Sequence, residues 1–207
     1  MSAVWVVKLG GSLAETDTLA QWLKVAASDG RGRVVVVPGG GAFAEQVRSS
    51  QARWRFDDST AHHMALLAME QFGLMLQGLC PALVPVSTAE EAVSVLQNAA
   101  TPIWMPSRMV LNAPEIARSW DVTSDSLAAW FAKQLGASHL VLVKSATLSR
   151  QSVPAQALRD GGVVDRAFPN FVKKNSFTTL LLGRADHELL EGMLRAGGVI
   201  GTRVLPN

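Results

Sequence analysis

Two glycine-rich stretches early in the sequence could bind phosphate groups. The first is "KLGGS" at residues 8–12, and the second is "PGGG" at residues 38–41. Each follows an apolar run and precedes a helical pattern, and the free backbone N–H groups at a helix start attract anions. Two such loops, one of them led by Lys8, indicate two anionic groups that face each other. The alternative is a pair of tight turns that need glycine only for its backbone freedom.

A third polar stretch, "SWDVTSDSLAAWF" at residues 119–131, begins a helical pattern. Asp121, Thr123 and Asp125 could serve simply as helix caps. One helix needs one cap, however, so four polar side chains before an apolar helix indicate that some of them face a site. Asp125 close to two lysines would hold their ammonium groups in place rather than take up a proton.

Several other kinds of site are disfavoured. The sequence has no Gly-Lys dipeptide and therefore no Walker A loop. Residues 39–44, "GGGAFA", fit a dinucleotide-binding fingerprint, but the region about 20 residues further on reads as a polar helix start rather than the end of a strand. His62 and His63 are adjacent and point about 100° apart on a helix, so both cannot bind one metal ion. We expect no metal held by protein side chains.

Composition narrows the class of protein. Of the 207 residues, 48% are hydrophobic and 17% are charged, which allows a sizeable buried core. The net charge of +2 and the scattered Lys and Arg residues argue against a nucleic-acid partner. The single cysteine, Cys80, permits no intrachain disulfide and fits a reducing compartment. The sequence shows neither a signal-peptide pattern nor an apolar run of about 18 residues, so we expect a cytoplasmic protein without a membrane span.

Short apolar runs alternate with helical patterns along the chain. The runs predict strands at residues 3–7, 33–37, 82–86, 102–105, 139–143, 177–183 and 201–205, and helical spacing predicts helices at 16–29, 59–79, 125–135 and 186–196, with a short helix after the triple glycine. This alternation is typical of an α/β protein in which a mainly parallel sheet lies between helices, a three-layer αβα sandwich. Ligands of such sheets bind at the carboxyl ends of the strands, where both glycine loops and "KS" at residues 144–145 fall. Residues 146–176 are the least regular stretch.

The predicted helix at residues 59–79 is apolar around most of its circumference. Such a helix is either deeply buried or shared with a second subunit. We therefore expect a homodimer or a higher homo-oligomer.

The quoted motifs together resemble the amino-acid kinase family, which includes acetylglutamate, uridylate and isopentenyl phosphate kinases. The stretches "VVKLGGSL", "VVVVPGGGAF", "DVTSDSLAAWFAKQLGASHLVLV" and "GTRV" run in the family's order over nearly the whole chain. The resemblance implies one amino-acid kinase domain over residues 1–207, with about 1–118 on the acceptor side and about 119–207 on the nucleotide side. It also implies ATP as phosphoryl donor, Mg²⁺ as its companion ion, and a small-molecule acceptor.

The resemblance implies three catalytic residues. Lys8 would stabilise the transferring phosphoryl group, and Asp125 would organise the lysines. Lys144 is similar to a lysine that uridylate kinases carry after this strand and would be the second cation. The glycine-methionine segment with a downstream lysine that is common in the family is not evident, so Lys173 and Lys174 remain alternatives for that cation.

The resemblance also divides the binding residues between the two substrates. On the nucleotide side it implies Gly10, Gly11, Ser12, Lys144 and Ser145. On the acceptor side it implies Gly39, Gly40, Gly41, Asp121 and Thr123.

The acceptor is narrowed by chemistry and by one further resemblance. A phosphate monoester is mostly a dianion near pH 7 and needs no general base, which fits the absence of a well-placed His or Glu beside the glycine loops. The block Trp120–Asp125 resembles a small branch of the family, the kinases of methanofuran biosynthesis, which convert (5-(aminomethyl)furan-3-yl)methyl phosphate to its diphosphate. Asp57 and Asp58 could pair with the ammonium group of such a substrate, or they could only cap the following helix.

Two alternatives stay open. The acceptor could be another phosphate or carboxylate, as in isopentenyl phosphate, UMP or acylamino-acid kinases, although the histidine that isopentenyl phosphate kinases carry shortly after the triple glycine is missing. The chain could also be a non-catalytic, anion-binding member of the same fold. Lys8 with Asp125 argues against this second alternative, because pure anion binding needs no carboxylate to organise a lysine.

Overall fold

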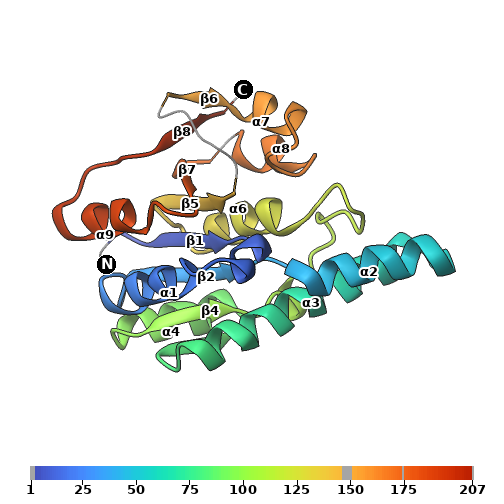
Figure 1. Cartoon of the computed structure of the whole chain (residues 1–207), viewed down its shortest axis with the longest axis horizontal. Coiled ribbons are helices and arrows are strands. Elements are labelled where there is room, and N and C mark those ends of the chain that lie inside the picture. The colour runs from blue at the N-terminus through green and yellow to red at the C-terminus, as the bar shows by residue number, and fades with distance from the viewer. Residues whose placement is uncertain (1–2, 146–150, 174, 207) are drawn as a thin grey trace.

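The computed structural model describes residues 3–145, 151–173 and 175–206. Within them, eight strands form one sheet in the order β3-β4-β2-β1-β5-β7-β8-β6 (Figure 1). The neighbouring strands pair in parallel, except that β8 runs antiparallel to β7. The strands are β1 (Trp5–Leu9), β2 (Val34–Pro38), β3 (Leu83–Val86), β4 (Thr101–Trp104), β5 (His139–Lys144), β6 (Val153–Pro154), β7 (Thr178–Gly183) and β8 (Thr202–Leu205).

Helices cover both faces of this sheet. One face packs mainly against α1 and α9, and the other mainly against α4, α6 and α8, while α3 contributes to both apolar cores. The predicted α/β class, with a mainly parallel sheet between helical layers, is confirmed. The helices are η1 (a 3₁₀ helix, Gly11–Glu15), α1 (Leu19–Ser28), α2 (Gly41–Trp54), α3 (Asp58–Leu79), α4 (Ala89–Gln97), α5 (Ser107–Val110), α6 (Ser124–Gln134), α7 (Ala155–Asp160), α8 (Phe168–Val172) and α9 (His187–Ala196).

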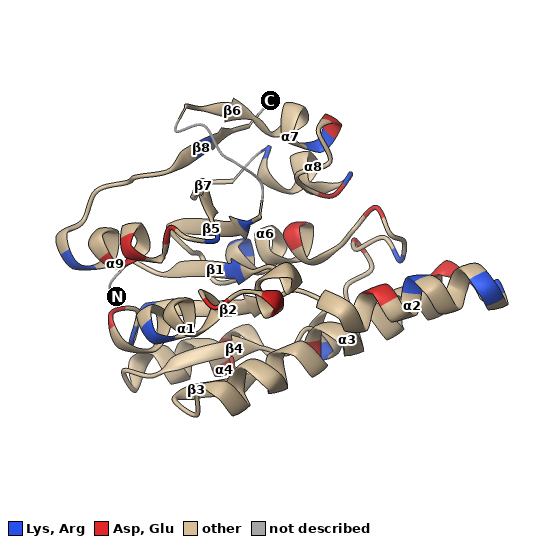
Figure 2. Cartoon of the chain, viewed as in Figure 1, with Lys and Arg blue, Asp and Glu red and all other residues tan. Residues whose placement is uncertain are grey.

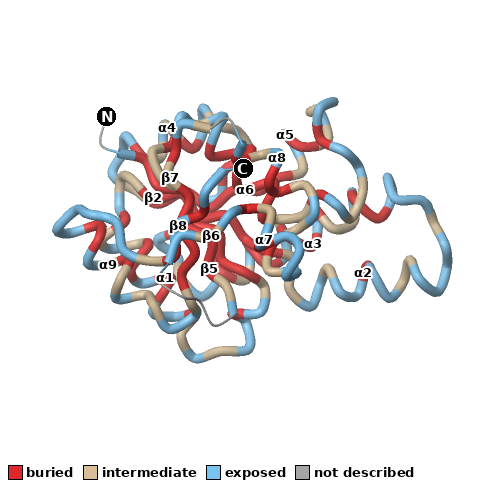
Figure 3. The backbone as a smooth tube through the Cα atoms, turned by 90° about the horizontal axis from the view of Figure 1, so that it is seen from above, coloured by how far each residue is buried: buried red, intermediate tan, exposed pale blue. Residues whose placement is uncertain are grey.

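The central strands are buried because they are almost wholly apolar. Figure 3 shows the sheet as the buried centre of the molecule, whereas α2 is exposed along most of its length. Helices α2 and α3 lie side by side and extend beyond the sheet (Figures 1 and 3). Lys and Arg residues are interspersed with Asp and Glu over the described elements (Figure 2). In the part of the chain described, no helix has both the length and the hydropathy needed to cross a bilayer.

The register of the central strands brings three polar segments to one edge. In β1, Leu9 is level with Pro38 of β2 and with Val143 of β5. Because the three strands are parallel, the "KLGGS" loop, the "PGGG" loop and Lys144 all emerge at the same edge of the sheet. Helix α6 begins at this edge too, since Asp125 in its first turn contacts Lys8 of β1 and Lys144 of β5.

Three segments differ from the sequence expectation. The helix expected from residue 16 begins at Leu19, because Thr16 is extended and follows the separate 3₁₀ helix η1. Helix α2 has 14 residues rather than being short. The stretch expected to be least regular contains β6, α7 and α8, while its residues 146–150 and 174 lie outside the described part of the chain.

Candidate active site

The two glycine loops pack directly against each other. A Cβ atom on Gly11 would lie 2.1 Å from Cα of Gly41, and one on Gly39 would lie 2.7 Å from the backbone nitrogen of Gly11. Real Cβ atoms do not approach other atoms so closely. Gly41 also has a φ of +55°, which favours glycine. The loops therefore need glycine both for close approach and for backbone conformation.

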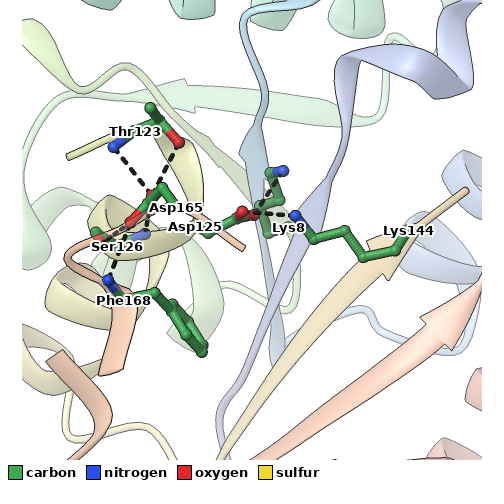
Figure 4. A network of polar contacts seen from close by, with 7 residues as sticks. All are labelled: Lys8, Thr123, Asp125, Ser126, Lys144, Asp165 and Phe168. Carbon is green, nitrogen blue, oxygen red and sulfur yellow. Dashed lines mark hydrogen bonds and ion pairs between the residues drawn. The ribbon is translucent and has the colours of Figure 1, made fainter. Parts of the chain in front are cut away.

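Three charged side chains meet beside these loops. Lys8 comes from β1, Lys144 ends β5, and Asp125 lies in the first turn of α6. The Nζ atom of Lys8 lies 2.8 Å from one carboxylate oxygen of Asp125, and that of Lys144 lies 2.5 Å from the other (Figure 4). The side chains of Lys8, Asp125 and Lys144 are only 6%, 6% and 15% exposed. One buried carboxylate thus holds two ammonium groups at the edge of the sheet.

The electrostatics of this cluster keep Asp125 ionised. Burial alone would raise the pKa of Asp125, but the ammonium groups of Lys8 and Lys144 lower it to about 2. Burial and the charge of Lys8 lower the pKa of Lys144, and the charge of Asp125 opposes that shift. A carboxyl group with such a low pKa does not accept a proton near pH 7. With all three groups ionised, the cluster carries one net positive charge, which attracts phosphate.

The start of α6 is held by a carboxylate from a distant segment. Asp165 accepts hydrogen bonds from the backbone nitrogen and hydroxyl of Thr123, at 3.0 and 2.8 Å. It also accepts from the backbone nitrogen of Ser126, at 3.0 Å, from the Ser126 hydroxyl, and from the backbone nitrogen of Phe168, at 3.0 Å (Figure 4). Burial and the negative charge of Asp125 raise the pKa of Asp165, and the bonds from Ser126 and Thr123 oppose that shift.

A cavity of about 600 Å³ opens beside the glycine loops. It lies between η1, α2, α3 and the start of α6, and the residues that line it are both polar and apolar. They are Gly11, Ser12, Glu15, Gly40, Gly41, Ala42, Ala44, Glu45, Gln46, Arg48, Ser49, His62, Ala65, Leu66, Met69, Trp120, Val122, Thr123, Ser124 and Leu127. Both glycine loops therefore contribute to one cavity.

The indole ring of Trp120 forms part of the cavity wall, and neighbouring side chains fix its position. The ring nitrogen of Trp120 donates a hydrogen bond to the Gln51 side chain at 2.6 Å, and the Gln51 amide donates to Asp58 at 2.8 Å. The guanidinium carbon of Arg48 lies 3.8 Å from the centroid of the Trp120 ring. Arg48 in turn lies 3.4 Å from Glu45. Trp120 is thus fixed by contacts with α2 and, through Gln51, with α3.

The residues predicted to bind the nucleotide lie around the end of β1 and β5. Gly11 and Ser12 line the cavity. A Cβ on Gly10 would lie 3.7 Å from the Nζ atom of Lys8, so Gly10 adjoins the charged cluster. Ser145 directly follows β5 and is exposed. Their role in nucleotide binding stays a prediction.

The residues predicted to bind the acceptor divide into two groups. Gly40, Gly41 and Thr123 line the cavity. Gly39 lies behind it, where its backbone nitrogen donates to the Leu9 carbonyl at 2.8 Å. Asp121 is exposed, is not among the lining residues, and lies 3.6 Å from Arg166.

Asp57 and Asp58 are engaged in holding helices. Asp57 caps α3, because its carboxylate accepts a hydrogen bond from the backbone nitrogen of Thr60 at 2.7 Å. Asp58 accepts the bond from Gln51, and neither aspartate is among the residues that line the cavity. A direct contact between these two carboxylates and an acceptor stays a prediction.

The alternatives for the second cation can also be located. Lys173 is exposed at the end of α8, and Lys174 lies outside the described residues. Lys144, by contrast, contacts Asp125 inside the cluster. Among the residues the structure describes, there is no group of three or more His, Cys, Asp or Glu side chains that could hold a metal ion.

Sequence reasoning missed Asp165 and the cavity residues of α2. Pro169 indicates a helix start nearby, and the free backbone N–H groups of such a start could bond a carboxylate just before it, such as Asp165. No local signal predicts its bonds to Thr123 and Ser126, which lie about 40 residues earlier in the chain.

A model of the amino acid kinase family matches residues 3–146, which is more than half of the chain. The chain belongs to the amino acid kinase family. Its sequence is 23% identical over 210 residues to the [5-(aminomethyl)furan-3-yl]methyl phosphate kinase of Methanocaldococcus jannaschii, a match that covers 97% of each chain. The predicted family is therefore confirmed.

Solved structures of the family share the fold. The uridylate kinase of Archaeoglobus fulgidus superposes with a TM-score of 0.74 at 16% identity, over 98% of this chain and 100% of that one. The UMP kinase of Ureaplasma parvum does so with a TM-score of 0.71 at 14% identity, over 99% of each. The amino acid kinase fold is thus present over nearly the whole chain, and the protein is a kinase with ATP as the implied phosphate donor.

Proposed function

We propose that this amino acid kinase transfers the terminal phosphoryl group of ATP to a small phosphate monoester and so forms a diphosphate. We propose [5-(aminomethyl)furan-3-yl]methyl phosphate as its acceptor. The observation that carries the reaction type is the pair of ammonium groups held on one buried carboxylate beside two touching glycine loops. The acceptor is supported by the name of the relative from Methanocaldococcus jannaschii, which matches over 97% of both chains.

The transfer needs positioning and charge stabilisation rather than covalent help from the protein. An oxygen of the acceptor phosphate attacks the terminal phosphorus of ATP, and the bond from that phosphorus to the bridging oxygen breaks, which releases ADP. The acceptor is already mostly a dianion near pH 7, so no residue has to remove a proton. Lys8 and Lys144 stabilise the negative charge on the transferring group, and Asp125 keeps both ammonium groups in place.

The two substrates would approach the cluster from opposite sides. On the nucleotide side we propose Gly10, Gly11 and Ser12, with Lys144 at the end of β5 and Ser145 directly after it. Mg²⁺ would arrive with ATP and be held by phosphate oxygens and water, as this ion usually is in kinases. Both carboxylate oxygens of Asp125 are taken by lysines, which fits a metal ion carried by the nucleotide.

On the acceptor side, the triple glycine would face the acceptor phosphate. Gly39 and Gly40 precede α2 and Gly41 begins it, while Thr123 and Asp121 precede α6. Residues 1–118 would then serve mainly the acceptor and residues 119–207 mainly the nucleotide.

The part of the cavity beside Trp120 suits a flat ring. The Trp120 indole forms part of the wall, and Leu66, Met69 and Leu127 add apolar surface. Aromatic pairs contribute about 0.5–1.5 kcal/mol beyond the area they bury, which favours a furan ring over an aliphatic chain.

Carboxylates at this part of the cavity would bind the aminomethyl group. Glu15 and Glu45 line the cavity and could pair with an ammonium ion. Asp57 and Asp58 do not line the cavity, and their carboxylates hold Thr60 and Gln51. Glu45 is itself 3.4 Å from Arg48, so among the described residues Glu15 is the carboxylate of the pair without an ion pair to an arginine. Asp58 would then act on the acceptor only through Gln51 and Trp120.

A release assay for ADP tests the proposal directly. The acceptors are [5-(aminomethyl)furan-3-yl]methyl phosphate, the same compound with methyl in place of aminomethyl, UMP and isopentenyl phosphate, each with ATP and Mg²⁺. We expect the highest kcat/KM with the aminomethyl compound and a diphosphate product by phosphorus NMR. A preference for UMP or for isopentenyl phosphate would refute the proposed acceptor, and nucleotide binding without turnover of any compound would refute the proposed reaction.

A further inference from the structure

We propose that Asp165 is a positioning residue for phosphoryl transfer, which acts by fixing the start of α6 and thereby the carboxylate of Asp125. This inference rests on the proposed reaction, since its activity readout is phosphoryl transfer. Asp165 has no assigned part in that reaction, and its side chain does not contact Lys8 or Lys144 through any bond the structure describes.

The first argument is the number and origin of the bonds that Asp165 accepts. One carboxylate oxygen takes the backbone nitrogen and hydroxyl of Thr123 and the backbone nitrogen of Ser126. The other takes the Ser126 hydroxyl and the backbone nitrogen of Phe168. Five donors from two segments about 40 residues apart therefore converge on one side chain.

The second argument is that Asp165 replaces the ordinary cap of α6. The residue before a helix usually accepts a bond from the third helical residue through its own side chain. Thr123 holds that position, but its side chain makes no such bond and instead donates to Asp165. The free backbone nitrogen of Ser126 is bonded by Asp165 as well. The first turn of α6 is thus held by another part of the chain.

The third argument is where Asp125 lies in this turn. It stands between Thr123 and Ser126, the two residues that Asp165 holds. Asp125 has to reach two lysines on two different strands at 2.8 and 2.5 Å. A rotation or fraying of the first turn of α6 would move its carboxylate away from at least one of them. Asp165 prevents that motion.

The fourth argument is the anchoring of Asp165 itself. Phe168, whose backbone nitrogen it accepts, is fully buried in the core against α6. The backbone nitrogen of Ala167 also donates to the carbonyl of Asp121 at 2.9 Å, which ties the same two segments a second time. Asp165 is therefore fixed by the core, and it can transmit that rigidity to the site.

The central experiment is a double-mutant cycle between Asp165→Asn and Asp125→Asn. It uses whichever acceptor the wild-type enzyme phosphorylates, so failure of the proposed acceptor does not affect it. Asn keeps the size of Asp but presents an NH₂ group to donors, so we expect kcat to fall about 10- to 100-fold with smaller changes in KM. In the Asp125→Asn background, Asp165→Asn should lower kcat by less than about twofold, because its effect acts through Asp125.

Two further variants serve as controls. Asp160→Asn removes an exposed carboxylate of α7 five residues away, and we expect kcat within about twofold of wild type. Ser126→Ala removes one hydrogen-bond donor to Asp165 and leaves the charge of Asp165 in place, so kcat should fall less than with Asp165→Asn. Combined with Asp125→Asn, Ser126→Ala should cause no further loss of kcat. Ser126→Ala also serves if Asp165→Asn does not fold.

Hydrogen exchange tests the clamp without turnover. In Asp165→Asn, the backbone amides of residues 123 and 126 should exchange at least about tenfold faster, while those of the later turns of α6 stay protected. The proposal is overturned if folded Asp165→Asn keeps kcat within about twofold of wild type. The proposal is also overturned if the free-energy costs of Asp165→Asn and Asp125→Asn, calculated from kcat, simply add in the double variant. Unchanged hydrogen exchange of the backbone amides at residues 123 and 126 would overturn it as well.

Discussion

Both oxygens of Asp125 are engaged by ammonium groups, and this limits the chemistry of the site. A carboxylate in that state is a poor proton acceptor near pH 7. Asp125 is therefore not suited to act as a general base, and an acceptor that arrives ionised needs none. A phosphate monoester meets this condition near pH 7, whereas an alcohol does not.

Two lysine variants test which residue supplies the second cation of the site. Lys144→Met should lower kcat about 10²- to 10³-fold, as expected for loss of a group that stabilises charge in the transition state. Lys173→Met, which changes an exposed lysine at the end of α8, should leave kcat within about twofold. The measurement is ADP release with ATP and the preferred acceptor. If Lys173→Met is the damaging variant, the assignment of Lys144 is wrong.

The low pKa of Asp125 predicts a stability change in acid. Folding lowers this pKa from about 4 to about 2, so the carboxylate stabilises the fold above pH 4 and loses that contribution as the pH falls toward 2. The pKa shift corresponds to about 2 kcal/mol of the free energy of unfolding.

Urea unfolding of the wild type and Asp125→Asn at pH 5 and pH 2.5 measures this contribution. The wild type should be the more stable protein at pH 5, and its advantage should shrink at pH 2.5. Asp165, whose pKa is shifted in the opposite direction, is present in both proteins, so the part of its shift that burial causes cancels. The part that the charge of Asp125 causes is lost together with that charge in Asp125→Asn. An advantage that stays constant between the two pH values would contradict the low pKa.

The charged cluster shows how far sequence reasoning reaches at the scale of residues. The resemblance to the amino acid kinase family implied the contact of Asp125 with two lysines. The fold explains it, because parallel strands deliver their last residues to one edge and the helix start lies there. Asp165 could not be expected, because its partners lie about 40 residues away and its own neighbours signal only a local cap. Arg48 and Gln51 were missed since only tertiary packing brings α2 beside Trp120.

At the scale of elements, the two glycine loops act as one unit. A substitution of Gly11→Ala would place a methyl group 2.1 Å from Cα of Gly41, so one loop would have to move away from the other. We expect a loss of at least about 1–3 kcal/mol in the free energy of unfolding, together with strongly reduced activity. Thermal unfolding and ADP release measure the two effects.

Gly78→Ala is the matched control for this substitution. Gly78 lies near the end of α3, and a Cβ there would meet nothing within 4 Å. Because alanine favours helix over glycine, this variant should gain about 0.5–1 kcal/mol and keep full activity. Equal behaviour of the two variants would contradict the close packing of the loops.

The elements that sequence patterns found are those with continuous apolar runs. The central strands were expected because continuous apolar runs predict burial, and α3 was expected because a helix cap precedes its long apolar helical pattern. Helix α4 was not identified, although "TAEE" is a capping box: Thr88 accepts from the nitrogen of Glu91, and Glu91 accepts from that of Ser87. The 3₁₀ helix η1 could not be expected, since contact between the glycine loops decides the path of the chain there.

At the scale of the whole molecule, α3 leaves an apolar stripe uncovered. Leu67 and Leu74 are 43% and 56% exposed on one face of that helix, and Leu79 at its end is 62% exposed. The sequence-based expectation of a homo-oligomer stays a prediction, and this stripe is the surface that would carry it.

The mass of the protein in solution tests whether the apolar stripe on α3 forms a subunit interface. Light scattering should give at least twice the chain mass of 22.1 kDa for the wild type, and Leu74→Glu should shift the protein toward the monomer. Ala20→Glu, which adds the same charge at an exposed position of α1, should leave the mass unchanged. A wild-type protein with the mass of one chain would contradict the prediction.

The sheet also joins the segment beyond the family match to the rest of the chain. The match ends at residue 146, yet β7 pairs with β5 along its full length and β8 continues the sheet. Residues after 146 therefore belong to the same structural framework as the charged cluster, and Asp165 is one of them.

The position of Trp120 in the cavity wall makes tryptophan fluorescence a direct measure of acceptor binding. The chain has six tryptophans and no tyrosine, so its near-ultraviolet emission comes almost wholly from indole rings. Trp120 lines the cavity while Trp22 and Trp104 are fully buried elsewhere. Acceptor that fills the cavity should therefore change the emission of one ring against a constant background, and Trp120→Phe should abolish that change. A titration followed by fluorescence would then report acceptor affinity in the absence of ATP.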